Sequence, residues 1–155
     1  MRNITALVVS LVLLGLAGCA PRVDVAADEA AVKKLFDDST ATLNASDARI
    51  TDFNTEDAVV MYADGPAAIG KPAIKERQRV IWDQAAFQET RSLEEVIVSG
   101  DLAFVRWTGR GTMTPKDGSA PSEFDRKGIT IFQRQPDNSW KTARVIWNSN
   151  RPVGE

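Results

Sequence analysis

The sequence predicts an α+β fold, with three helices among its earlier elements and four long antiparallel strands after them. Residues 28–44 carry apolar side chains at helical spacing, which predicts an amphipathic helix. Residues 123–150 contain two β-branched and aromatic runs on either side of a turn cluster at 135–139, which predicts a hairpin of long strands. Of the 155 residues, 43% are hydrophobic, which suits one compact core. Residues 28–155 are therefore expected to form a single domain.

Residues 1–18 are predicted to be a lipoprotein signal peptide. An apolar run over residues 4–14 follows Arg2 and leads into the sequence LAGC, which ends at Cys19. The pattern resembles the lipobox of bacterial lipoproteins, in which the Cys19 thiol receives the lipid. The alternative is an ordinary signal peptide, or a membrane anchor, with an incidental cysteine. The run is shorter than the roughly 20 residues that span a bilayer, which favours the signal peptide.

The lipobox predicts a protein of the bacterial cell envelope that is held to the membrane by acyl chains on Cys19. By resemblance to lipoproteins of two-membrane bacteria, Ala20 after the cysteine favours the outer membrane, with the domain facing the periplasm. Residues 19–27 are then a short tether. Because Cys19 is the only cysteine, the fold has no intramolecular disulfide.

The charge balance argues against nucleic acid as a partner. The chain has 19 basic and 21 acidic side chains, and cleavage before Cys19 would remove the basic Arg2. A nucleic-acid-binding surface would need an excess of basic residues or a basic stripe, and the sequence has neither.

Three helices are expected before the long strands. The first begins near Asp28, which can cap it, and its apolar stripe consists of Val32, Leu35, Phe36, Ser39 and Leu43. A short second helix is capped by Ser46 or Asp47 and runs through Phe53. The third helix opens with Lys71 and Pro72, since proline at the first helical position loses no internal hydrogen bond. Its residues Ile74, Ile81 and Trp82 are expected to face the core.

The strands are expected at residues 58–62, 87–99, 102–114 and within 123–150, with a tight turn at Gly100 and Asp101. Residues 102–114 alternate between an apolar face that includes Val105 and Trp107 and a basic and hydroxyl face that includes Arg106. In the hairpin, both faces carry large side chains. Such a sheet needs two covers, which predicts helices on one face and a partner subunit on the other, as in a homodimer.

The order of elements, together with five motifs, resembles the nuclear transport factor 2-like superfamily, and in particular its SnoaL-like and ketosteroid isomerase-like branch with its envelope proteins. The motifs are LNASD (43–47), EDAVVMYADG (56–65), GKPAI (70–74), GDLAFVRWTGRGTM (100–113) and DNSWKTARVIWNSNRP (137–152). This resemblance implies a cone, in which a curved antiparallel sheet wraps around the N-terminal helix. It also implies a pocket at the open end of the cone and a dimer across the outer face.

The family's catalytic residues are not kept in this chain. By resemblance to ketosteroid isomerases, the tyrosine position falls on Ser39, the base on Tyr62, and the third group near Gly128. Limonene epoxide hydrolases use an aspartate, arginine, aspartate set; Arg106 and Arg144 are present here, but Trp107, Thr108 and Val145 stand near the positions of the acids. The chain has no histidine, which is the commonest general base at neutral pH and a frequent metal ligand. We therefore expect neither a metal nor a cofactor.

The pocket is instead predicted to be lined by aromatic and basic groups. The aromatic candidates are Tyr62, Trp82, Trp107 and Trp147, and the polar candidates that would orient a ligand are Arg106, Arg126, Arg144 and Asn148. Alternatively, each tryptophan belongs to the core or to a dimer interface, and the arginines form cross-strand ion pairs with Glu94, Glu123 or Asp125.

Two hypotheses follow for the function. In the first, the chain is a lipid-anchored module whose pocket binds a small apolar or weakly acidic molecule without turnover. In the second, it is an enzyme of the isomerase, cyclase or hydrolase kind with an atypical carboxylate base such as Asp57, Glu94 or Asp125. The absence of the isomerase groups favours the first.

Overall fold

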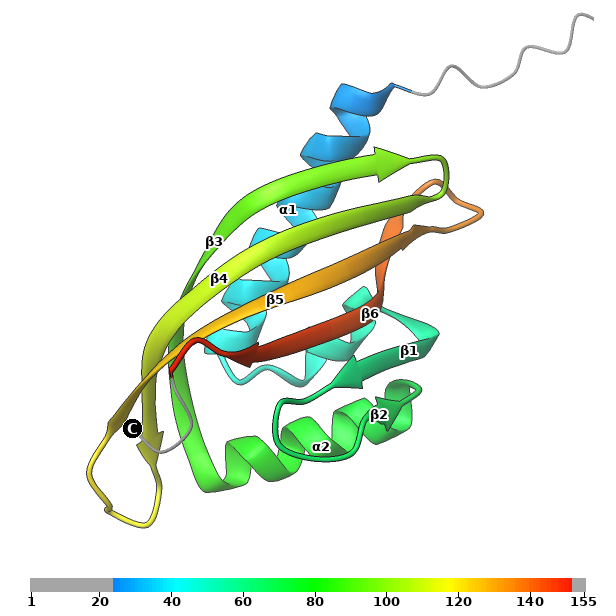
Figure 1. The fold of residues 1–155 in the computed structure, drawn as a ribbon. Helices are drawn as coiled ribbons and strands as arrows, with labels where there is room; N and C mark the ends of the chain where they lie inside the picture. The colour runs from blue at the N-terminus through cyan, green and yellow to red at the C-terminus, as the bar shows by residue number, and fades with distance from the viewer. Residues whose placement is uncertain (1–23, 152–155) are drawn as a thin grey trace, which may run out of the picture.

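The structure is a computed structural model that describes residues 24–151, in which helices pack on one side of a curved six-stranded sheet (Figure 1). The elements follow in the order α1 (Val25–Asn44), the 3-10 helix η1 (Ala48–Phe53), β1 (Asn54–Met61), β2 (Ala68–Ile69), α2 (Lys71–Gln84), β3 (Ala85–Ser99), β4 (Leu102–Pro115), β5 (Ser122–Arg134) and β6 (Trp140–Ser149). The predicted α+β class, with three helices and a curved, mostly antiparallel sheet, is confirmed. The signal peptide and Cys19 lie outside the described residues.

Helix α1 begins three residues earlier than predicted, so the expected tether at 19–27 is too long. The cap is Asp24, whose side chain accepts a hydrogen bond from the backbone N–H of Ala27 at 3.1 Å. Asp28 therefore lies within the first turn and does not cap the helix. Its carboxylate instead accepts hydrogen bonds from both Nη atoms of Arg134 on β5, at 2.7 and 2.6 Å. At the start of η1, Asp47 is the capping residue.

The sheet has the strand order β2-β1-β6-β5-β4-β3. All neighbouring pairs are antiparallel except β1 and β6, which run parallel with Val60 opposite Val145. Strand β1 starts four residues before the predicted strand, and its pairing with β6 shifts register between Asn54 and Val59. The two-residue strand β2 was not predicted, because so short a run has no periodicity to read.

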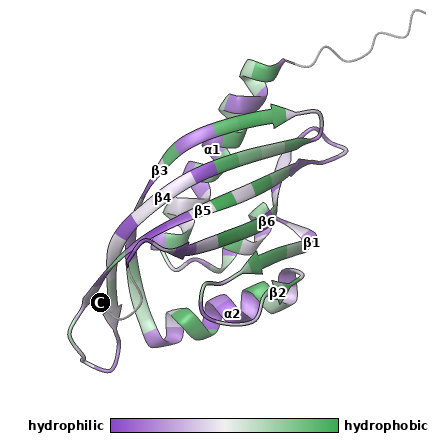
Figure 2. Ribbon diagram, in the orientation of Figure 1, coloured by the Kyte–Doolittle hydropathy of each residue, from purple (hydrophilic) through white to green (hydrophobic). Residues whose placement is uncertain are grey.

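The alternation predicted along residues 102–114 is confirmed in β4. Ala103, Val105 and Trp107 are buried on the concave face, whereas Arg106 between them is exposed. Figure 2 shows hydrophobic stretches on β3, β4 and β5 toward the β3–β4 turn, and on β6 and β1. The core cluster joins β4 to α1 and to the hairpin through Val32, Phe36, Ala103, Val105, Trp107, Phe132 and Trp140. Alternating burial thus places one face of the sheet against α1.

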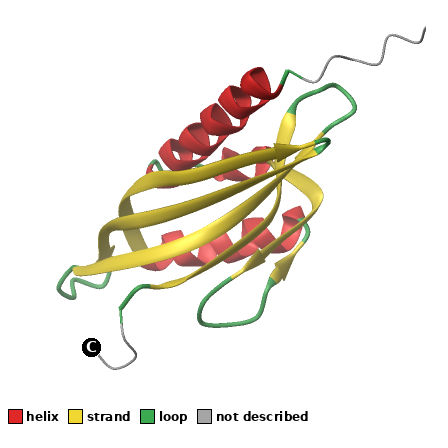
Figure 3. Ribbon diagram, turned by 45° about the horizontal axis from the view of Figure 1, so that its top comes forward, coloured by secondary structure: helices red, strands yellow, loops and turns green. Residues whose placement is uncertain are grey.

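Within residues 24–151, no helix covers the convex face of the sheet, since α1 and α2 both lie on the opposite side (Figure 3). Ile97, Leu102 and Ile146 on this face are 51%, 52% and 46% exposed. A cover for this face, the predicted partner subunit, stays a prediction. None of the helices in residues 24–151 is both long and apolar enough to cross a membrane.

Candidate functional site

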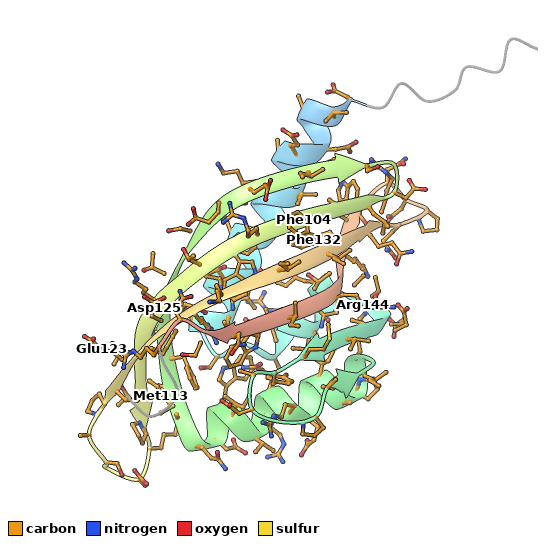
Figure 4. The ribbon with its side chains drawn as sticks, viewed as in Figure 1. Phe104, Met113, Glu123, Asp125, Phe132 and Arg144 are labelled. Carbon is orange, nitrogen blue, oxygen red and sulfur yellow. The ribbon has the colours of Figure 1, made fainter. Side chains whose placement is uncertain are left out.

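A cavity of about 360 Å³ lies between the helices and the concave face of the sheet. Its wall includes the C-terminal half of α1, which contributes Phe36, Ser39 and Leu43, and α2 contributes Ile74 and Ile81. From the sheet, Met113 on β4 and Phe132 on β5 also line it; both are labelled in Figure 4. Further apolar lining comes from Ile50, Phe53, Val60, Phe87, Val145 and Trp147. A cavity of this size and apolar character is typical of a small-molecule site.

Three of the predicted pocket residues line this cavity: Tyr62, Arg126 and Trp147. The Tyr62 and Trp147 rings pack edge to face with centroids 6.3 Å apart, and the Arg77 guanidinium lies 5.2 Å from the Tyr62 ring. Burial raises the pKa of Tyr62, and the charge of Arg77 offsets part of that rise. Tyr62 therefore offers a neutral hydroxyl at physiological pH.

Trp107 and Trp82 do not line the cavity. Trp107 is only 1% exposed and packs under Phe36, and its Nε1–H donates to Thr130 Oγ1 at 3.1 Å. Gly128 makes room for this indole, because a Cβ at position 128 would overlap with its ring. Trp82 lies near the end of α2, and its buried Nε1 has no hydrogen-bond partner among the described residues.

Arg106, Arg144 and Asn148 lie on the convex face and are absent from the cavity wall. Arg106 pairs with Glu95 at 3.2 Å, and Arg144, labelled in Figure 4, pairs with Asp57 at 3.2 Å. The side chain of Asn148 accepts a hydrogen bond from the backbone N–H of Ser149. The physical reason is the strand period of two: each of these residues is next to an inward-facing residue, so its own side chain must point outward. The alternation visible in the sequence could have excluded them.

Of the three positions that correspond to the isomerase catalytic groups, two lie at the cavity and one does not. Ser39 and Tyr62 both line the cavity, but the Ser39 hydroxyl donates to the carbonyl of Phe36 on its own helix at 2.8 Å. Gly128 lies beneath Trp107. The proposed bases Asp57, Glu94 and Asp125 are all outside the cavity wall. Each is engaged elsewhere, Asp57 with Arg144, Glu94 with Thr108, and Asp125 with Arg110.

Two residues of a charged cluster at the cavity, Glu89 and Arg91, were missed in the sequence, whereas their partner Arg126 was predicted. Glu89 on β3 has a side chain that is 0% exposed, and it pairs with Arg91 on the same strand and with Arg126 on β5. The Glu89 carboxylate accepts from Arg91 Nε at 3.0 Å, from Arg126 Nε at 2.6 Å and from Arg126 Nη2. Arg91 and Arg126 line the cavity, and we call the three residues the Glu89 cluster. Along β3, Glu89 and Arg91 point to the same inward face of the sheet as Phe87 and Leu93, because they lie two residues apart. Two charged residues on an otherwise apolar face were the signal in the sequence that could have predicted this cluster.

Two residues from other elements hold this cluster in place: Asn44 through its side-chain amide, and Gly109 through the absence of a side chain. Asn44, the last residue of α1, donates from Nδ2 to the Glu89 carbonyl at 2.7 Å and accepts from the Glu89 N–H at 2.9 Å. Gly109 on β4 lies opposite both Arg91 and Arg126, and a Cβ there would overlap with Glu89 Oε1. The missing side chain therefore lets two arginines from strands on either side of β4 reach one carboxylate.

Among residues 24–151, no group of three or more histidine, cysteine, aspartate or glutamate side chains is placed to hold a metal ion. The remaining charged groups of the cavity wall are Asp64, which is exposed in the turn after β1, and Arg77 on α2. The site thus has a mostly apolar wall that contains the guanidinium groups of Arg91 and Arg126 at one end. Asp64 is the only carboxylate among the described lining residues, and it is exposed.

Residues 32–141 match the SnoaL-like domain family. A similar solved structure is a ketosteroid isomerase-like protein from Erwinia carotovora atroseptica SCRI1043, with a TM-score of 0.77 and 25% identity, covering 81% of this chain and 98% of that one. Hexachlorocyclohexane dehydrochlorinase LinA-type3 from Novosphingobium barchaimii LL02 has a TM-score of 0.72 and 17% identity, covering 84% and 93%.

A nuclear transport factor 2-like superfamily protein from Salmonella enterica serovar Typhimurium LT2 has a TM-score of 0.72 and 12% identity, covering 83% of this chain and 95% of that one. Comparison with curated proteins gave no match. At 17% and 12% identity, the last two structures show a shared fold, and one fold supports many activities.

Proposed function

Because the chain belongs to the SnoaL-like domain family, we propose that its cavity binds a small apolar or weakly acidic molecule without turning it over. The observation that carries this proposal is the cavity wall, which is mostly apolar and contains the guanidinium groups of Arg91 and Arg126. Its volume of about 360 Å³ is at the lower end of the usual range for ligand sites. The ligand is therefore a compact molecule.

The absence of turnover rests on the carboxylates near the cavity. A general base must be within hydrogen-bond reach of the proton it removes and must be free to accept it. Glu89 is buried and already accepts from two arginines, so taking up a proton would cost it both ion pairs. Among the described residues that line the cavity, only Asp64 is a carboxylate, and it is exposed.

We test binding and turnover together on protein purified from its own membrane in detergent. Organic extraction followed by mass spectrometry is expected to release a small compound from the wild type that Ser39→Phe does not retain. The phenyl ring would enter the cavity from α1, where empty space lets a larger side chain fit with little strain. Identical extracts from both proteins would contradict the proposal, and so would chemical conversion of the retained compound on incubation.

The second candidate is an enzyme of the isomerase, cyclase or hydrolase kind, and the position of Asp64 is the observation that favours it. Asp64 lines the same cavity as Tyr62, so a carboxylate and a neutral hydroxyl could act on one ligand. In this case the retained compound is converted by the wild type, and Asp64→Asn abolishes the conversion while leaving binding within about twofold.

We further propose that the chain is anchored in the bacterial envelope by lipid on Cys19, in the outer membrane and facing the periplasm. The lipobox supports this, and the first helix, α1, starts at Val25, only a few residues after Cys19. The cavity residues of α1 lie in its C-terminal half, away from the anchored end. Cys19→Ala is expected to give an unlipidated precursor that no longer partitions into detergent; unchanged partitioning would overturn the anchor.

The convex face supports a homodimer, which we also propose. Ile97, Leu102 and Ile146 expose apolar surface on a face that none of the described helices covers, and a second copy could cover them. Light scattering at micromolar concentration is expected to give a dimer for the wild type and a monomer for Ile146→Glu. A monomeric wild type would rule this out.

A further inference from the structure

The Glu89 cluster carries more positive charge than its own carboxylate needs. A buried carboxylate requires a partner, and one arginine is sufficient to neutralise it. Here Arg126 already holds Glu89 through two N–H groups, and Arg91 adds a second cation. The cluster therefore presents a surplus of one positive charge to the cavity. A purely structural ion pair would need only one of the two arginines.

The two arginines also keep unused hydrogen-bond donors. A guanidinium carries five N–H groups in a rigid fork. In the part of the chain that the structure describes, the side chain of Arg91 donates only from Nε, and that of Arg126 only from Nε and Nη2. Both Nη atoms of Arg91 and Nη1 of Arg126 thus have no acceptor from residues 24–151. Burial lowers the pKa of Arg91, and the neighbouring charge of Arg126 lowers it further, while Glu89 opposes both effects. A second anion would relieve this under-compensated charge.

Aromatic rings fix the orientation of both guanidinium groups. The Arg91 Cζ lies 4.6 Å from the centroid of a Trp107 ring and 6.0 Å from that of Phe36. The Arg126 Cζ lies 5.0 Å from a Trp147 ring centroid and 4.8 Å from that of Phe124. Such stacking, together with the shared carboxylate, holds the donors in place before a ligand arrives, which reduces the entropy lost on binding.

We infer that Arg91 and Arg126 bind the carboxylate of an amphipathic monocarboxylic acid whose apolar body fills the rest of the cavity. The planar fork of a guanidinium matches the two oxygens of a carboxylate. One surplus charge suits a monoanion, whereas a phosphate dianion would bring an unpaired charge into an apolar cavity. The cavity has room for about a dozen water-sized groups, which corresponds to a short-chain or single-ring acid. This inference rests on the proposed function, because it names the charged end of the molecule that the cavity binds.

The test compares 4-phenylbutanoate with 4-phenylbutanamide, which has nearly the same shape and no charge. Isothermal titration of the mature protein at neutral pH is expected to show that the acid binds at least about tenfold more tightly than the amide. Arg91→Gln leaves Glu89 paired with Arg126 but removes the surplus charge, so the ratio of the affinities for the acid and the amide should fall to about one. Loss of amide binding as well would mean that Arg91 acts on the fold, and this would overturn the inference.

Arg106→Gln is the matched control, because it removes one positive charge from the convex face. It is expected to leave the affinities for the acid and for the amide unchanged. If Arg106→Gln lost the preference for the acid as fully as Arg91→Gln does, the preference would come from the overall charge of the protein, and this would overturn the inference. If Arg91→Gln does not fold, Glu89→Gln provides the second test, since two unneutralised guanidiniums must raise the preference for the acid. Equal binding of acid and amide by the wild type overturns this inference but leaves the proposed function standing. Binding of neither compound up to about 10 mM overturns both.

Discussion

Two tryptophans occupy the same row of the sheet and have different roles. Trp107 on β4 and Trp147 on β6 lie opposite Gly128 from either side, and all three residues face inward. Trp107 is packed beneath α1 with its Nε1–H bonded to Thr130, whereas Trp147 forms part of the cavity wall against Tyr62. The pairing of β4, β5 and β6 aligns Trp107, Gly128 and Trp147 in one row. The path of α1 decides which of the two tryptophans is covered by a helix. The concave face therefore has a packed end for stability and an open end for a ligand.

The largest effect is expected from truncating the packed tryptophan. Trp107→Ala should lower the free energy of unfolding by about 3–5 kcal/mol, because it removes the largest fully buried side chain and leaves a void between α1 and the sheet. Trp147→Ala, the matched change at the open end, should cost less than half as much, since its ring already faces empty space. Urea denaturation of both variants measures the difference. Equal losses would mean that the two ends are packed alike.

The next effect concerns the glycine between the two tryptophans. Gly128→Ala is expected to destabilise the protein by about 1–3 kcal/mol, because its Cβ would overlap with the Trp107 ring and lie 2.8 Å from the Ile146 carbonyl. Trp107 must then move, so its near-ultraviolet circular dichroism should change as well. Lys127→Ala, on the exposed face next to it, is the control and should have little effect. Unchanged stability of Gly128→Ala would show that the row tolerates a side chain at its centre.

The packed end is also expected to be sensitive to acid. Hydrogen bonds from Arg134 and its positive charge hold the pKa of Asp28 below its usual value. For a carboxyl whose folded-state pKa is depressed, the stabilisation is present above the unfolded-state pKa of about 3.9 and is lost as pH falls through the lower folded-state value. Denaturation midpoints of the wild type should therefore fall more steeply below about pH 4 than those of Asp28→Asn. Parallel curves would assign the acid sensitivity to other carboxyl groups.

The smallest effect is expected on the convex face. Arg144→Gln removes an exposed ion pair with Asp57 and should change stability by about 0–1 kcal/mol. It should leave ligand affinity at the open end unchanged, because the side chain points away from the cavity. Thermal denaturation and the same titration measure the two properties. A clear loss of affinity would show that the convex face contributes to binding.

The local pattern of the sequence determined the elements and the faces. Helical spacing over residues 28–44 predicted α1 to within three residues at its start, and alternation over residues 102–114 predicted which side of β4 is buried. These features depend on neighbours within a few positions along the chain, so their signal is local. The same alternation separates Arg106 from Trp107, although both were predicted to line one pocket.

Only the tertiary structure decided how these elements meet. The parallel pairing of β1 with β6 and the approach of Arg91 and Arg126 to Glu89 across Gly109 join residues that are far apart in the sequence. From the composition alone, each arginine could pair with any of many carboxylates. Each of the four tryptophans could likewise belong to the core, to an interface or to a pocket. The crossing of α1 over β3, with Phe36 packed on Trp107 of β4, fills one end of the concave face and leaves the other open. Because this crossing is set by packing over the whole domain, it has no counterpart in any short stretch of sequence.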